Sequence, residues 1–425
     1  MQAREIKAVA ELGGEAAGVA TTLVRDMHAG IASRVFGAIG PAAKPTHIIH
    51  DAVARAIYGG LDGGIRGATR AAGALASEVW GRDGDGSLES QPTVAAAIAA
   101  INGLYGDQLA AHRNGFALTM QIRHHGTAVP LTADEVAAAF PTATGRLAVF
   151  VHGLFLTERS WWCTPRTGED LPSYGQRLHH EHGFTPVYLR YNTGLHISDN
   201  GQTLADMLHR LEALWPLPID EIVLVGHSMG GLVTRSACYY GEQQQHRWTE
   251  AVRHVVCLGS PHLGTDLEKA VHIASWALAR LPETRAVAGF LDTRSAGIKD
   301  LRFGACIEED WQDCDPGEFL RDRCQEVPFL PWAGYHFVAT TAAPSAVGLL
   351  VGDHLVRSHS ARGWGKTRRL PFQPEHGLTL TGLHHFDLLN HPTIYSKLRE
   401  WVTHHRHSPA ATGDQGLGRR STVSL

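Results

Sequence analysis

The sequence is poor in cysteine and contains no long apolar or basic run. Its six cysteines include no CxxC pair, which argues against dithiol redox motifs and cysteine zinc sites. No stretch approaches the roughly 18 uninterrupted apolar residues of a transmembrane helix, so any membrane contact is expected to be peripheral. With Lys+Arg 38 against Asp+Glu 42, the chain shows no electrostatic footprint for nucleic acid.

Signals for targeting and for metal binding are also missing. The first ten residues, MQAREIKAVA, contain charges and no apolar core of a secretory signal, so we expect a cytoplasmic protein. Histidines number 27, but the pairs are adjacent in sequence and no HExxH motif occurs. Neighbouring residues do not share a helix face, so we predict no metal and no other cofactor. The sequence leaves the oligomeric state open.

The composition divides the chain into five parts. A length of 425 residues with 44% hydrophobic content suffices for one large domain and an accessory segment. We expect a helical N-terminal extension at 1–80, a polar linker at 81–92, a core made of 93–265 and 335–407, a cap or lid at 266–334, and a disordered tail at 408–425. The Ala- and Gly-rich extension either packs as plain helices or contacts a lipid surface or partner.

The core has the pattern of an α/β fold. A hairpin is expected near 116–131, with its turn at His125-Gly126. Further strands are predicted at 146–151, 187–191, 221–225, 254–258, 336–340 and 378–381, and helices at 174–182, 203–214 and 392–402. Strands that alternate with helices predict a mostly parallel sheet flanked by helices.

A GxSxG motif stands between a predicted strand and a predicted helix. It runs Gly226-His227-Ser228-Met229-Gly230, after the apolar run EIVLV and before a helix-compatible run at 232–240. A nucleophile elbow is a sharp turn of this kind between a strand and a helix. The turn is so tight that it requires small residues two positions before and two positions after the serine. We therefore expect Ser228 to be a nucleophile.

A serine nucleophile needs a base, and the base needs an orienting acid, in the chain order Ser, Asp or Glu, His. Asp353 follows a predicted strand at a loop position and is the expected acid. Its rivals are Asp292, Asp310, Asp313 and Asp387. The base should follow the last core strand, which leaves His384 or His385.

Two backbone N–H groups are candidates for the oxyanion hole. One belongs to Met229, directly after the nucleophile, and the other to Leu154, in the loop after an early strand. We expect His152 to shape this loop by hydrogen bonding, the alternative being a catalytic acid. Trp161 and Trp162 follow the loop and either line an acyl pocket or pack in the core.

Five motifs resemble those of a known family. They are FVHGL (150–154), GHSMGGLVTRSA (226–237), GSPHLGT (259–265), GDHLVRSHSA (352–361) and HHFDLL (384–389). Together they resemble bacterial lipases and the PGAP1-like (GPI inositol-deacylase-like) branch of the α/β hydrolases, over roughly residues 114–405. The resemblance implies an α/β-hydrolase fold with an inserted cap, and a triad of Ser228, Asp353 and His385.

The motifs and the resemblance lead to one functional hypothesis and two alternatives. We expect a serine esterase or lipase that hydrolyses lipid-like carboxylic esters through an acyl-enzyme. An acyltransferase would use the same triad and pass the acyl group to another acceptor. A non-catalytic binding protein on a hydrolase fold is the third hypothesis.

Overall fold

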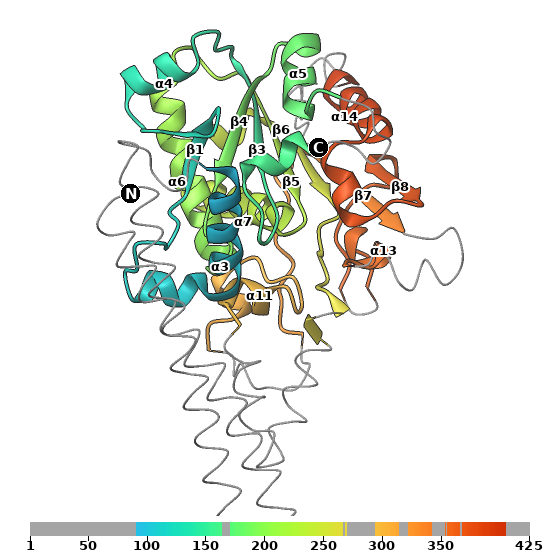
Figure 1. Cartoon of the computed structure of the whole chain (residues 1–425). Helices are drawn as coiled ribbons and strands as arrows, with labels where there is room; N and C mark the ends of the chain where they lie inside the picture. Colours follow the sequence, from blue (N-terminus) through green and yellow to red (C-terminus); the bar gives the residue numbers. More distant parts are fainter. Residues whose placement is uncertain are drawn as a thin grey trace, which may run out of the picture.

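The computed structural model describes residues 91–163, 171–266, 268–269, 294–313, 322–341, 353, 355–365 and 368–404. Figure 1 traces the whole chain and labels the elements. The expected extension at 1–80, nearly all of the linker at 81–92 and the tail at 408–425 lie outside the described residues, as does much of the expected cap at 266–334.

A single eight-stranded sheet forms the centre of the fold, in the order β2-β1-β4-β3-β5-β6-β7-β8. The strands are β1 (Gln121–His124), β2 (Thr127–Val129), β3 (Arg146–Val151), β4 (Thr185–Arg190), β5 (Glu221–His227), β6 (Val252–Leu258), β7 (Gly334–Thr341) and β8 (Gly377–Thr381). All neighbouring pairs from β4 to β8 are parallel, and only β1 pairs antiparallel, with β2 and β4. The predicted mostly parallel α/β fold is therefore confirmed.

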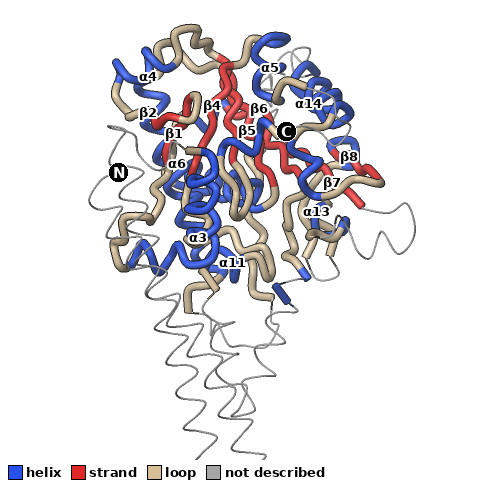
Figure 2. Tube along the Cα trace, viewed as in Figure 1, coloured by secondary structure: helices blue, strands red, loops and turns tan. Residues whose placement is uncertain are grey.

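Helices cover both faces of the sheet, which explains its continuous apolar strands. Leu147, Val149 and Val151 of β3 pack with α6 (Ile197–Leu214) and α7 (Met229–Gln243). Ala148 and Phe150 point to the other face and pack with α5 (Tyr174–His182) and α14 (Pro392–His404). Figures 1 and 2 show these two helical layers with the sheet between them. Period-two alternation along one buried strand thus builds two cores.

The remaining described elements are short. They are α4 (Ala133–Ala139), α8 (Trp248–Ala251), α11 (Ala296–Asp300), α13 (Ser358–Ala361), and the 3₁₀ turns η3 (Glu158–Trp162), η4 (Glu308–Asp310), η5 (Pro374–His376) and η6 (His385–Leu389). The predicted hairpin is present as β1 and β2. Its turn residues His125 and Gly126 have φ of 47° and 80°, the left-handed values that a two-residue hairpin turn requires.

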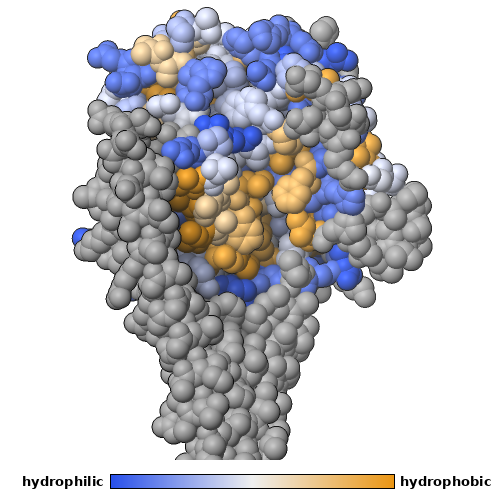
Figure 3. Space-filling view, viewed as in Figure 1, coloured by the Kyte–Doolittle hydropathy of each residue, from blue (hydrophilic) through white to orange (hydrophobic). Residues whose placement is uncertain are grey.

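Helix α3 (Pro92–Ala111) joins the domain from the N-terminal side. The Ser295 hydroxyl donates to the Gly103 carbonyl at 2.6 Å, and the Ala296 N–H donates to the Asp107 carboxylate at 3.0 Å. Figure 3 shows apolar residues gathered over α3 on the viewed face, where Leu104 is 43% exposed. Helix α3 therefore anchors the start of α11, a segment more than 180 residues away in the sequence.

Candidate active site

The serine of the GxSxG motif occupies a sharp turn between β5 and α7. Ser228 has φ 53° and ψ −124°, a conformation that non-glycine residues rarely adopt. A Cβ placed on Gly226 would lie 2.4 Å from the Gly231 nitrogen, and one on Gly230 would lie 2.2 Å from the Val151 carbonyl oxygen. Both positions therefore exclude any side chain, and the backbone geometry is that of a nucleophile elbow.

An aspartate and a histidine form a buried pair. The His385 Nδ1 lies 2.7 Å from the Asp353 Oδ2, and the two residues are 3% and 1% exposed. The other carboxylate oxygen accepts the N–H groups of Leu355 and Val356 at 3.1 and 2.7 Å. Burial raises the pKa of Asp353, but these hydrogen bonds and the one from His385 outweigh it and hold the pKa below its ordinary value. The carboxylate is thus ionised and oriented toward the imidazole.

The turn after β6 lies against both the serine and the histidine. The Ser228 N–H donates to the Leu258 carbonyl at 2.8 Å, so the elbow is tied to the end of β6. The next residue, Gly259, has φ 61°, and a Cβ there would lie 3.2 Å from His385 Cε1. The parallel strands β5, β6 and β7 are neighbours, so their carboxyl ends lie side by side. The residues that follow these strands therefore meet at that end of the sheet.

His227, directly before the serine, contacts the loop that carries His385. Its Nε2 lies 3.1 Å from the His385 carbonyl oxygen, and the two ring centroids are 4.7 Å apart. Burial, with a smaller contribution from His385, lowers the pKa of His227 to about 3, so the ring is neutral. Since a carbonyl oxygen only accepts, Nε2 carries the proton. In the sequence, His227 is only the variable residue before the serine of GxSxG. Its place in the motif therefore gives no signal of this contact.

The expected oxyanion donors lie against the serine. Met229 is the first residue of α7, and the first four N–H groups of a helix have no intrahelical partner. Gly153 and Leu154 line the same cavity as Ser228, and a Cβ on Gly153 would lie 2.9 Å from the Ser228 Cβ. Gly153 is therefore close to Ser228 in space, and Met229 is next to it in the sequence.

His152 shapes the loop that carries Leu154. Its Nδ1 lies 2.9 Å from the Gly153 carbonyl, its ring stacks on Tyr191 at 4.5 Å, and the Tyr191 hydroxyl donates to the His152 carbonyl at 2.7 Å. Burial lowers the pKa of His152 to about 4. The neutral ring is fully buried and is not among the described residues that line the cavity.

The cavity at Ser228 has a volume of about 450 Å³ and is mainly apolar. Its apolar lining comprises Leu154, Phe155, Leu156, Pro261, Ile298, Leu301, Leu355, Val356 and Phe386. Phe155, Leu355 and Phe386 are 38%, 39% and 54% exposed and form an apolar rim. His385 and Ser228 lie in this wall, together with Thr265, Glu268 and Arg294. Such a lining suits an apolar ligand group.

Comparison with known proteins identifies the fold. Residues 142–280 match the family model of the PGAP1-like alpha/beta domain, a stretch that begins just before β3 and extends beyond β6. The chain has an α/β-hydrolase fold. The match confirms the resemblance to the PGAP1-like branch, and no curated protein gives a significant sequence match.

Solved structures of other proteins align with this α/β-hydrolase domain at low similarity. A Bacillus licheniformis lipase in mature form is 19% identical, with TM-score 0.38, covering 60% of this chain and 91% of that one. Staphylococcus hyicus lipase is 13% identical, with TM-score 0.36 and coverages of 62% and 95%. Homoserine O-acetyltransferase from Staphylococcus aureus is 12% identical, with TM-score 0.36 and coverages of 61% and 86%.

Of the rival acids that the structure describes, two accept backbone N–H groups and one is exposed. Asp310 accepts the N–H groups of Cys306 and Gln325, Asp387 accepts the N–H of His384, and Asp313 is exposed. Asp292 lies outside the described residues. The Asp353 carboxylate accepts a hydrogen bond from a histidine ring of the HHFDLL motif, that of His385, whereas Asp387 accepts a backbone N–H.

The two tryptophans pack against other aromatic rings. Trp161 is fully buried, 5.1 Å from Phe150 between ring centroids. Trp162 is 41% exposed and lies 4.4 Å from Tyr188. Neither is among the described residues that line the cavity at Ser228, so they serve packing here.

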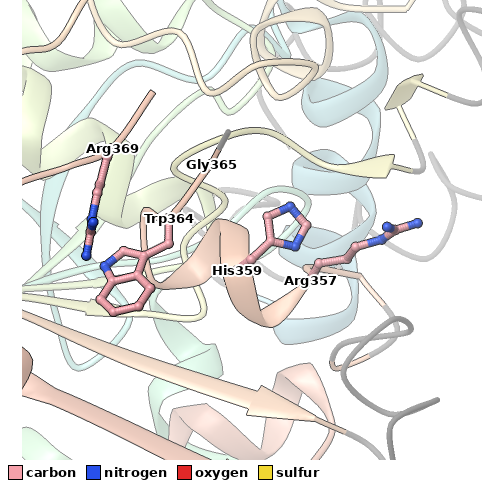
Figure 4. Close-up of a pocket in the computed structure, with 5 residues that line it drawn as sticks. All are labelled: Arg357, His359, Trp364, Gly365 and Arg369. Atoms are coloured by element: carbon pink, nitrogen blue, oxygen red, sulfur yellow. The ribbon is translucent and has the colours of Figure 1, made fainter. Parts of the chain in front are cut away.

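A second pocket lies around α13, and the residues that line it come soon after Leu355 and Val356 in the sequence. Its volume is about 580 Å³, and it is lined by Arg357, His359, Trp364, Gly365 and Arg369 from α13 and the following turn (Figure 4). Leu355 and Val356 line the cavity at Ser228, whereas Arg357 lines this second pocket. The Arg369 guanidinium lies 4.3 Å from the Trp364 ring centroid, and Arg357 is paired with Asp266. Cations therefore surround this pocket.

Metal clusters and membrane-spanning helices are both absent from the part of the chain that the structure describes. Across the described ranges, no cluster of three or more His, Cys, Asp or Glu side chains is arranged to hold a metal ion. Within the same ranges, every helix is too short or too polar to cross a membrane.

Proposed function

We propose that this protein is a serine carboxylic ester hydrolase of the esterase or lipase type, with a triad of Ser228, His385 and Asp353. The observation that carries the proposal is the buried 2.7 Å pair of Asp353 and His385, because His385 lines the same cavity as Ser228, which stands on a strained turn. These are the parts that acyl transfer through a serine needs.

Acylation begins with the transfer of the Ser228 hydroxyl proton to Nε2 of His385 as Oγ attacks the ester carbonyl. The Nδ1–H of His385 donates to Asp353, which keeps Nε2 free to accept and stabilises the imidazolium. The backbone N–H groups of Leu154 and Met229 donate to the tetrahedral oxyanion. His385 then returns the proton to the alcohol as the C–O bond breaks.

Deacylation repeats these steps with water. A water molecule gives its proton to His385 as its oxygen attacks the acyl-enzyme, and the proton then returns to Ser228 as the acid leaves. The apolar lining of the cavity supports an acyl chain as the group bound beside Ser228. We therefore infer lipid-like esters as substrates.

The proposal is tested with a chain-length series of p-nitrophenyl esters and with phospholipids, on the wild-type protein and on Ser228→Ala. We expect turnover by the wild type, a fall of at least about 10³-fold in kcat for Ser228→Ala, and labelling of the wild type alone by a fluorophosphonate probe. Undiminished turnover by the mutant would exclude the mechanism. Lack of both turnover and labelling in the wild type would favour a binding protein.

Product analysis in the presence of an acceptor alcohol separates hydrolysis from acyl transfer. A hydrolase releases mainly free acid at millimolar acceptor, because water resolves the acyl-enzyme. If the acyl group passes quantitatively to the acceptor, the protein is an acyltransferase with the same triad.

A further inference from the structure

The loop that carries Leu154 also contains a residue in a rarely adopted backbone conformation. Phe155 directly follows Leu154 and has φ 65°, in the left-handed region that favours glycine. A residue persists in such a conformation only when the structure around it holds it there. The contacts of Phe155 therefore hold the backbone beside Leu154, whose N–H group is a proposed oxyanion donor.

The Phe155 ring lies against a buried glycine of α3. A Cβ on Gly103 would lie 2.1 Å from Phe155 Cδ1 and 2.4 Å from Cε1, so the ring occupies the place of a side chain at Gly103. Alanine is a stronger helix former than glycine, so this contact and not the helix requires glycine there. The same ring lines the cavity at Ser228. Phe155 thus connects α3 to the cavity.

Helix α3 also contacts the loop after β4, which touches the backbone of Phe155. The Asn192 side-chain amide donates to the Gly106 carbonyl at 2.9 Å, and a Cβ on Gly106 would lie 1.9 Å from Asn192 Oδ1. The next residue, Thr193, accepts the Phe155 N–H with its hydroxyl oxygen at 3.4 Å. Helix α3 therefore supports Phe155 at its ring directly and at its backbone through this loop.

This helix lies outside the stretch that matches the PGAP1-like family model, which begins at residue 142. We propose that the contact between Gly103 and Phe155 positions the oxyanion loop (residues 152–156), so that α3 influences the reaction without contributing a reacting group. Gly103 acts through Phe155, and Phe155 acts through the backbone of Leu154. The inference rests on the proposed ester hydrolysis at Ser228 and adds positioning residues to it.

The expected signature is a slower reaction with unchanged substrate binding. An oxyanion donor contributes only when it points at the oxygen of the tetrahedral intermediate, so a shifted loop weakens the transition state more than the bound ester. Gly103→Ala introduces a methyl group that must displace the Phe155 ring. We expect kcat on p-nitrophenyl hexanoate to fall about tenfold or more, and KM to change less than about threefold.

Gly241→Ala in α7 is the matched control. A Cβ on Gly241 would lie 2.6 Å from Trp248 Cζ2, so the same substitution again meets an aromatic ring. Gly241 is about 18 Å along the helix from Met229, at a rise of about 1.5 Å per residue. Gly241→Ala should therefore lower the urea midpoint, as Gly103→Ala does, but leave kcat within about twofold of the wild type.

A double variant tests whether the two residues act through each other. Leucine lacks the edge of the Phe155 ring that meets Gly103, so Phe155→Leu gives the added methyl group room. We expect Phe155→Leu to lower kcat about threefold, and the double variant Gly103→Ala/Phe155→Leu to be no slower than Phe155→Leu. A double variant whose loss is the product of the two single losses would show that the residues act independently, and would overturn the proposal.

A pair of inhibitors separates positioning from a general loss of structure. A trifluoromethyl ketone forms a tetrahedral adduct with a catalytic serine and places an oxyanion in the donor site, whereas the matching methyl ketone binds without that charge. Gly103→Ala should raise Ki of the trifluoromethyl ketone about tenfold and that of the methyl ketone less than about twofold. Should Gly103→Ala fail to fold, Phe155→Leu should show the same selectivity at about threefold.

Equal increases in Ki for both ketones would reduce the contact to a structural role. The positioning role is also wrong if folded Gly103→Ala retains full kcat, or if Gly241→Ala loses as much kcat as Gly103→Ala. Undiminished turnover by Ser228→Ala would instead overturn the triad, so the two failures are distinguishable.

Discussion

The Asp353 carboxylate accepts a hydrogen bond from His385 Nδ1 at 2.7 Å while the backbone N–H groups of Leu355 and Val356 hold its other oxygen. The acid is thereby fixed from two sides, and it presents one oxygen to the imidazole. This relationship defines the tautomer of His385 in which Nε2 has no proton and can accept one.

Replacing the acid tests this tautomer. Asp353→Asn keeps the size of the side chain but removes the charge and can present an N–H to His385, so we expect kcat to fall by about 10³–10⁴-fold with little change in KM. Asp387→Asn is the matched control, because Asp387 caps the turn beside His385 through the N–H of His384. Steady-state kinetics on a p-nitrophenyl ester provide the measurement. A loss under tenfold in Asp353→Asn would refute the assigned role.

His227 is predicted to be a positioning residue, because its Nε2–H holds the His385 carbonyl. His227→Phe retains a ring but removes the donor, and we expect kcat and the rate of fluorophosphonate labelling to fall about tenfold while KM stays nearly constant. His227→Gln restores an N–H donor and should recover part of both rates. Equal rates for the Phe and Gln variants would show that the hydrogen bond has no such role.

The elbow glycines are predicted to be essential for folding stability. Because a Cβ on Gly230 would lie 2.2 Å from the Val151 carbonyl oxygen, Gly230→Ala must displace backbone, and we expect a loss of about 3 kcal/mol or more in the free energy of unfolding. Gly183 has φ 67° with nothing within 4 Å of a Cβ, so Gly183→Ala should cost only about 1 kcal/mol. Urea unfolding measures both, and similar losses would contradict the steric argument.

Buried histidines are predicted to make the folded state sensitive to acid. Burial lowers the pKa of His152 to about 4 and of His227 to about 3, and burial with Arg235 and Arg368 lowers the pKa of His262 well below its ordinary value. Below about pH 6.5 these histidines therefore bind more protons in the unfolded chain than in the folded one, and their contribution to stability falls as the pH falls.

The effect is measured as the slope of unfolding free energy between pH 6 and 5. Each such histidine should contribute about 1 kcal/mol per pH unit, so His262→Gln should reduce the slope by that amount. His180→Gln changes an exposed side chain and is expected to leave the slope as it is. An unchanged slope in His262→Gln would mean that His262 does not take up a proton on unfolding.

The local pattern of the sequence was sufficient to predict the fold. Apolar strands of five to eight residues alternate with helices, and parallel strands buried on both faces have this composition. The GxSxG motif after such a strand predicted the elbow, since the steric demand for glycine at 226 and 230 is local. Chain order and loop position indicated Asp353 as the acid, whereas the base stayed open between His384 and His385 until the family resemblance favoured His385.

Only the tertiary structure decided which distant side chains meet. Asp353 and His385 are 32 residues apart, and His227 and His385 are 158 apart, so the register of the parallel strands had to place their ends together. No sequence motif marks the ion pair of Glu268 and Arg294, because an ion pair requires only opposite charges at a short distance. Sequence spacing encodes the local turn that presents Ser228, whereas the packing of strand ends and loops defines the surroundings of Ser228.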